Sequence, residues 1–161
     1  DIACRMRLTV LDCPPGLLGE DAARFEEALQ TQTRFGVGAA YEPGRLREHP
    51  VMDEDWSVSP VTAALKQRAH AQLGTSGHGN HFVEFGRLTV ERDVDEPSFK
   101  LKAGSYAALL SHSGSRGLGK AVADHYSAVA RSLNQDIPEE LRHLAWLELG
   151  SPEGREYWAA M

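Results

Sequence analysis

The sequence has 161 residues, of which 42% are hydrophobic, and a formal net charge of −6 from 17 basic and 23 acidic side chains. This length can bury one sizeable core, and no apolar run approaches a transmembrane helix, so we expect one globular unit without a membrane partner. The negative charge excludes wholesale wrapping by nucleic acid but allows a local phosphate site. Two cysteines, Cys4 and Cys13, are too few for a disulfide framework, and without a signal peptide they predict a cytoplasmic protein.

The first elements along the chain are a strand and a helix. Residues 3–11 alternate apolar and polar side chains, which is typical of a half-buried strand. An amphipathic helix is expected over about 20–33, where apolar positions recur three and four apart and Gly36 ends the segment. Residues 36–58 combine Gly, Pro and mixed charges without a period, and predict irregular surface structure.

The second half of the chain alternates between helices and strands. Ser59-Pro60 combines an N-cap residue with proline at the first helical position, and predicts a helix that ends before Gly74. The later elements expected are strands at about 80–92 and 99–111 joined by a polar connection at 93–97, a glycine loop at 113–120 followed by a helix to about 133, and a helix beginning at 151–152. Together the elements predict an α+β (mixed α/β) fold of twisted β-sheets flanked by helices.

The stretch 74–84, Gly-Thr-Ser-Gly-His-Gly-Asn-His-Phe-Val-Glu, carries the densest chemistry. Its glycines allow positive φ and a close approach of the backbone to a ligand. Asn80, His81 and Glu84 then supply an amide, an imidazole and a carboxylate. If the chain is extended from residue 80, alternation places His81 on one side and Asn80 and Glu84 on the other, unless a turn or bulge intervenes. One side could then hold a metal and the other a ligand.

Four side chains are candidate metal ligands: Asp1, Cys4, His81 and His112. Carboxylate, thiolate and imidazole groups together suit a borderline divalent metal, and a thiolate can bridge two ions. The alternative is that Cys4 is a small core hydrophobe and that two of seven histidines fall near strand ends by chance. The spacing leaves both interpretations open.

The run from Gly114 to Lys120 nearly fits a phosphate-binding P-loop, because it follows a strand and precedes a helix. Ala121 stands where a P-loop needs Ser or Thr to reach magnesium, so a nucleoside triphosphatase fits poorly. Arg116 inside the loop remains a natural bidentate phosphate ligand, and the alternative is an arginine that faces solvent.

Three segments together, Asp1-Ile-Ala-Cys4, 74–84 and His112–Gly119, resemble the RtcB family of RNA-splicing ligases in order and separation. The resemblance covers most of the chain but only a middle portion of such a ligase. It implies that residues 1–161 form a single partial domain of RtcB-like fold that lacks the N-terminal and C-terminal portions. Members of the family join an RNA 3′-phosphate or 2′,3′-cyclic phosphate to a 5′-hydroxyl, using GTP, manganese and a histidine that becomes guanylylated.

The resemblance also implies roles for individual residues. Asp1, Cys4 and His81 would hold one manganese ion, and Cys4 and His112 would hold a second together with a histidine further downstream. The segment implied to contact GTP consists of Asn80, His81, Phe82, Val83 and Glu84, with Glu84 reaching the guanine.

Arg116 would bind an RNA phosphate near the junction. The nucleophilic histidine is expected beyond Met161, so we expect no catalytic nucleophile within the chain and no ligation by the chain alone. The alternative is a non-catalytic metal- or phosphate-binding module of degenerate ligase fold.

The chain departs from the family's pattern at four positions. The family commonly has glycine where this chain has Ala3 and Arg5, and a Gly-Thr-Leu-Gly-Gly-Gly-Asn-His-like run where it has Ser76 and His78. Arg5 and His78 are expected to add bulk and charge near the metals, which bears on the range of substrates.

Overall fold

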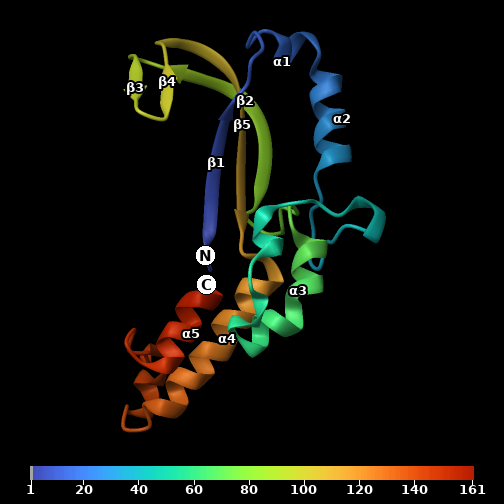
Figure 1. Ribbon diagram of the computed structural model, residues 1–161. Helices are drawn as coiled ribbons and strands as arrows, with labels where there is room; N and C mark the ends of the chain where they lie inside the picture. The colour runs from blue at the N-terminus through green and yellow to red at the C-terminus, as the bar shows by residue number, and fades with distance from the viewer. Residues whose placement is uncertain (1) are drawn as a thin grey trace. The chain divides into compact units, whose positions relative to one another are not determined.

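A computed structural model describes residues 2–161, so the predicted ligand Asp1 lies outside the described residues (Figure 1). The protein has the predicted α+β fold. Its strands are β1 (Cys4–Val10), β2 (Phe82–Val90), β3 (Val94–Glu96), β4 (Phe99–Leu101) and β5 (Gly104–Gly114). Its helices are α1 (Leu17–Glu20), α2 (Ala22–Gln32), α3 (Pro60–Gln72), α4 (Arg116–Leu133) and α5 (Pro152–Ala160), with short 3₁₀ helices η1 (Pro43–Arg45), η2 (Pro50–Asp53), η3 (Trp56–Val58) and η4 (Glu139–Leu144). None of the helices in residues 2–161 combines the length and apolarity needed to cross a bilayer.

The chain divides into two compact units. The helical unit contains residues 2–4 together with Gly38–Gly74 and Gly114–Met161. The sheet unit contains Arg5–Val37 and Thr75–Ser113. The division passes through β1, so Cys4 begins a strand that otherwise belongs to the sheet unit.

The sheet unit is built on three strands in the order β1-β5-β2, which lie side by side in Figure 1. β2 pairs antiparallel with β5, from Phe82 opposite His112 to Val90 opposite Gly104. Helix α2 packs on β2 through an edge-to-face contact between Phe25 and Phe85, whose ring centroids are 4.8 Å apart. The predicted strand after the glycine-rich stretch and the amphipathic helix near residues 20–33 are therefore both present.

β1 is an outer strand of this sheet. The Leu11 N–H donates to the Ala107 carbonyl oxygen at 2.9 Å and so holds the end of β1 beside β5. The alternation predicted a buried apolar face, but Met6 and Leu8 are 64% and 50% exposed. An outer strand has a neighbour on one side only, and α2 packs over β2 at the opposite edge of the sheet. The prediction of a strand is therefore confirmed, but the prediction that its apolar face is buried is wrong.

The polar connection predicted at 93–97 is part of a β-hairpin. β3 and β4 pair antiparallel, with Val94 opposite Leu101. Lys102 Nζ lies 2.6 Å from Asp93 Oδ2, and Lys100 Nζ lies 2.7 Å from Asp95 Oδ1. Aspartate is depleted in strands, which is why the sequence indicated a loop, whereas oppositely charged cross-strand pairs favour the hairpin.

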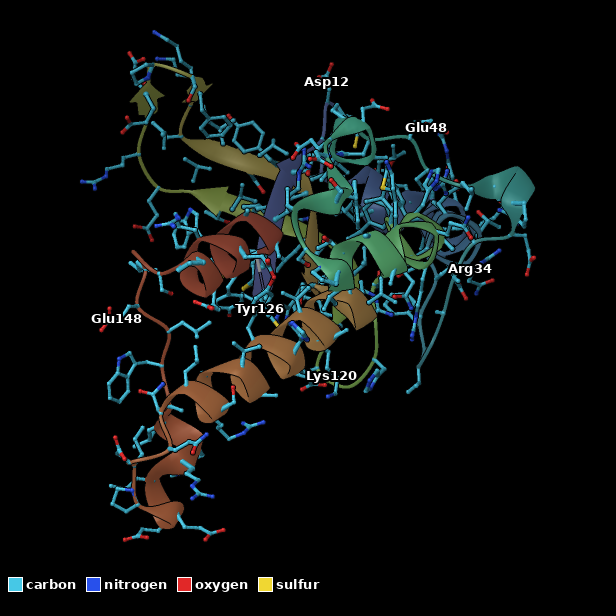
Figure 2. The ribbon with its side chains drawn as sticks, turned by 60° about the horizontal axis from the view of Figure 1, so that its bottom comes forward. Asp12, Arg34, Glu48, Lys120, Tyr126 and Glu148 are labelled. Carbon is cyan, nitrogen blue, oxygen red and sulfur yellow. The ribbon has the colours of Figure 1, made fainter. Side chains whose placement is uncertain are left out.

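The helical unit has α4 at its centre, in contact with α3 and α5. Val122, Tyr126 and Ala130 are buried at intervals of four residues, which confirms that this helix has an apolar face. The Tyr126 hydroxyl (Figure 2) donates to Glu156 Oε1 on α5 at 2.6 Å. Burial and this hydrogen bond raise the pKa of Tyr126 to about 12, so the phenol stays protonated and the bond persists at neutral pH.

At Gly154, α5 lies against the backbone of the preceding segment. A Cβ placed on Gly154 would lie 2.0 Å from the Glu148 carbonyl oxygen, and backbone atoms cannot rotate away as a side chain can. We expect Gly154→Ala to lower the free energy of unfolding by about 1–3 kcal/mol, measured by chemical denaturation. Gly150→Ala is the matched control, because a Cβ on Gly150 meets no atom within 4 Å. Equal stability of the two variants would contradict the close approach at residue 154.

Candidate metal centre

The glycine-rich turn ends where β2 begins, at Phe82. Gly77 and Gly79 have φ angles of 106° and 73°, in the region that disfavours side chains with a Cβ. Asn80 is exposed in the turn and His81 is half-buried just before the strand. The strand thus starts two residues later than predicted, and His81 is placed by the turn and not by the strand's alternation.

His81 and His112 approach each other in the sheet unit. Their ring centroids are 5.4 Å apart, and Phe82 lies edge-on to His112 at 5.6 Å. His81 Nδ1 is buried. Two neighbouring imidazoles are common metal ligands, so this pair is a candidate for binding an ion.

Cys4 adds a sulfur ligand at the start of β1, the strand next to β5 in the sheet. One ligand atom from each of Cys4, His81 and His112 falls in a group whose members all lie within 4.8 Å of one another. Bonds of about 2.0–2.3 Å from a metal to nitrogen or sulfur allow such a group to hold one ion, or two neighbouring ions, after small side-chain movements. Cys4 is exposed and is not in a disulfide. The donor set fits a borderline divalent metal.

The residues expected to contact GTP divide between the two faces of β2. Phe82 and Glu84 lie opposite His112 and Leu110, so they share one face of the sheet with His112. Val83 points to the other face, where Phe85 packs against α2. The turn brings the His81 ring to His112. A turn thus intervenes before β2, which is the exception that the sequence analysis allowed, and strand alternation applies only from Phe82 onward.

Arg116 is the first residue of α4 and has a φ of 56°, the one positive φ outside glycine among residues 2–161. The first turn of the helix contains no acidic side chain, and the Gly117 N–H donates to Gln72 Oε1 at 3.3 Å. Burial lowers the pKa of Arg116, but an arginine remains charged at neutral pH. The positive helix end and the guanidinium both favour an anion at this position.

Arg68 on α3 lies beside this helix end, and the sequence did not indicate it. Its Nη2 atom is 3.2 Å from the position that a Cβ on Gly117 would take. Within the sequence Arg68 is an ordinary polar position of a helix, so only the packing of α3 on α4 reveals its place. Lys120, labelled in Figure 2, instead forms an exposed ion pair with Asp124 at 2.5 Å. That pairing disfavours the P-loop alternative, in which the lysine would face a phosphate.

The fold and this donor group define an α+β protein with a cysteine–histidine cluster at one end of an antiparallel sheet. Residues 16–161 match the family described as tRNA-splicing ligase RtcB, and the chain belongs to the RtcB family. The match includes the second and third resembling segments and begins after Cys4.

Curated relatives carry the same description. The tRNA-splicing ligase RtcB of Aeropyrum pernix is 34% identical over 146 residues, and that of Methanocaldococcus jannaschii is 31% identical over 143 residues. Each alignment covers 85% of this chain, but only 30% of the first relative and 14% of the second. The chain thus spans less than a third of the length of these relatives.

Proposed function

We propose that the protein containing this chain is a GTP- and manganese-dependent RNA ligase that joins 3′-phosphate or 2′,3′-cyclic phosphate ends to 5′-hydroxyl ends. Membership of a family whose curated relatives are named tRNA-splicing ligases carries the proposal. The group formed by Cys4, His81 and His112 supports the metal requirement. The proposal assigns the enzyme to the cytoplasm, where free cysteines remain reduced.

In the proposal, Cys4, His81 and His112 hold two manganese ions, with Asp1 and a histidine from outside the chain completing the ligands. Cys4 would supply the negative charge that offsets the repulsion between two cations. Bound manganese would supply charge neutralisation and Lewis acidity at phosphate oxygens. The ring of Phe82 packs edge-on against the imidazole of His112, with the ring centroids 5.6 Å apart.

The nucleotide site is proposed for the turn and the first residues of β2. Glu84 is exposed on the same sheet face as His112, so its carboxylate is open to accept hydrogen bonds from the N–H groups of guanine. Asn80 offers an amide from the turn, and Phe82 offers an aromatic edge. Val83 contributes through its backbone, because its side chain lies on the opposite face.

The RNA phosphate is proposed to bind at Arg116. The planar guanidinium can form two parallel hydrogen bonds to a phosphate. The partial positive charge at the N-terminal end of α4 also attracts the anion. Arg68 supplies a second positive charge next to Gly117. The substrate end would thus meet two guanidinium groups and no acidic side chain in the first turn of the helix.

Incubation with radiolabelled GTP and manganese, followed by denaturing electrophoresis, tests the proposal. We expect the full-length protein to form a covalent GMP adduct and the 161-residue chain to form none, since the nucleophilic histidine is proposed to lie outside it. A labelled band from the chain alone would place the nucleophile within it and overturn the assignment. Manganese binding without any label on the full-length protein would identify a non-catalytic module instead.

A further inference from the structure

The glycine-rich turn is held along one side by the segment that follows α2. The Ser76 N–H donates to the Arg34 carbonyl oxygen at 2.9 Å, and the Gly36 N–H donates to the Gly77 carbonyl oxygen at 2.8 Å. Phe35 and Gly77 form an isolated parallel bridge between these bonds. This short ladder fixes the beginning of the turn within the sheet unit.

A second anchor comes from β5. The Ser113 hydroxyl donates to the Ser76 carbonyl oxygen at 2.7 Å and lies 3.3 Å from the Thr75 carbonyl oxygen. Thr75 and Ser76 are each 5% exposed, so water cannot readily replace a lost partner. A buried carbonyl requires a donor, and Ser113 supplies it.

We propose that Ser113 is a positioning residue for the metal centre, through its hold on the turn that carries His81. His112 and Ser113 are consecutive on β5, so their side chains leave the strand on opposite faces. His112 meets the His81 ring, while Ser113 holds the backbone five residues before His81. One strand therefore sets the position of one ligand directly and of the other through the main chain.

The composition of the turn explains why such an anchor matters. Gly77 and Gly79 both occupy positive φ, and glycine adopts many other conformations at little cost once its restraints are removed. Without the Ser113 hydroxyl, the turn would sample arrangements in which His81 no longer faces His112. The inference rests on the proposed metal role of these histidines. The experiment below distinguishes a failure of the Ser113 inference from a failure of the metal proposal.

Cobalt(II) binding to the metal-stripped full-length protein provides the test, because cobalt bound to a thiolate gives a charge-transfer band and its d–d bands report ligand geometry. We expect Ser113→Ala to weaken the apparent cobalt affinity by about 10–100-fold and to change the d–d spectrum. Ser113→Thr keeps the hydroxyl and should recover both. Ser105→Ala is the matched control, since Ser105 is an exposed serine at the other end of β5.

Ser113→Val provides a second comparison if the alanine variant does not fold, because valine and threonine have the same shape and differ in the hydroxyl. A folded Ala or Val variant with unchanged affinity and spectrum would overturn the inference. A folded Thr variant that fails to recover would also assign Ser113 to packing alone. If the unsubstituted protein shows no thiolate–cobalt band, or keeps it after Cys4→Ala, the metal proposal itself fails.

Discussion

Cys4→Ala in the full-length protein is expected to abolish the GMP adduct and to remove most of the bound manganese. Cys4 is the one sulfur ligand in the group with His81 and His112, and in the proposed site it would supply the negative charge among the described ligands. Without the thiolate, the two cations lose the negative charge that offsets their repulsion. The loss in metal affinity should exceed the roughly 10–100-fold typical of residues that only orient a ligand.

Cys13→Ala is the control for this substitution. Cys13 is the second cysteine of the chain, half-buried after β1 and outside the ligand group. The Cys13→Ala protein should retain full metal content, measured by elemental analysis, and normal labelling with GTP. Retention of both properties by the Cys4 variant would show that the group does not bind the metal that the reaction needs.

Arg116→Ala is expected to weaken RNA joining by about 10–100-fold while leaving self-guanylylation largely unchanged. A hydrogen bond to a charged group contributes about 1.5–3 kcal/mol, and a phosphate loses that contribution when the guanidinium is removed. Joining is measured with radiolabelled RNA ends, and guanylylation with labelled GTP on the same preparations. Loss of guanylylation with normal RNA binding would contradict the assigned role.

Two further variants separate the guanidinium from the backbone. Arg116→Gly relieves the φ of 56°, so a joining defect shared by the Ala and Gly variants reflects the lost side chain and not an altered backbone. Arg131→Ala removes an exposed arginine from the last turn of the same helix and should leave joining unchanged. If Arg131→Ala lowered RNA joining as much as Arg116→Ala does, the effect would come from the overall charge of the protein and not from a specific phosphate contact.

The helix starts were predictable because their signals are local. Ser59 accepts a hydrogen bond from the Thr62 N–H at 3.1 Å, and Ser151 accepts one from the Gly154 N–H at 2.9 Å. Each of these caps needs only residues three apart in the chain, with proline as the first helical residue. The sequence therefore carried enough information to place α3 and α5.

The strands were less predictable, because their burial and pairing depend on distant residues. The alternation in β1 predicted the strand correctly, but not its place at the outside of the sheet, where Met6 and Leu8 are exposed. The β3–β4 hairpin was missed because its stabilising pairs, such as Lys102 with Asp93, join residues nine positions apart. Local propensity at Asp93 alone indicates a loop.

For the candidate site, the sequence by itself determined the kinds of ligand and the family, since thiolate, imidazole and glycine-rich motifs are read directly from residue types. Only the tertiary structure decided which groups meet. The antiparallel register of β2 and β5 sets Phe82 opposite His112, the turn before β2 brings the His81 ring to His112, and Ser113 on β5 reaches Ser76 in that turn. Arg68 joins the α4 terminus only through helix packing. The physical reason is that side-chain chemistry belongs to single residues, whereas these contacts join segments more than thirty residues apart, where no local pattern records the pairing.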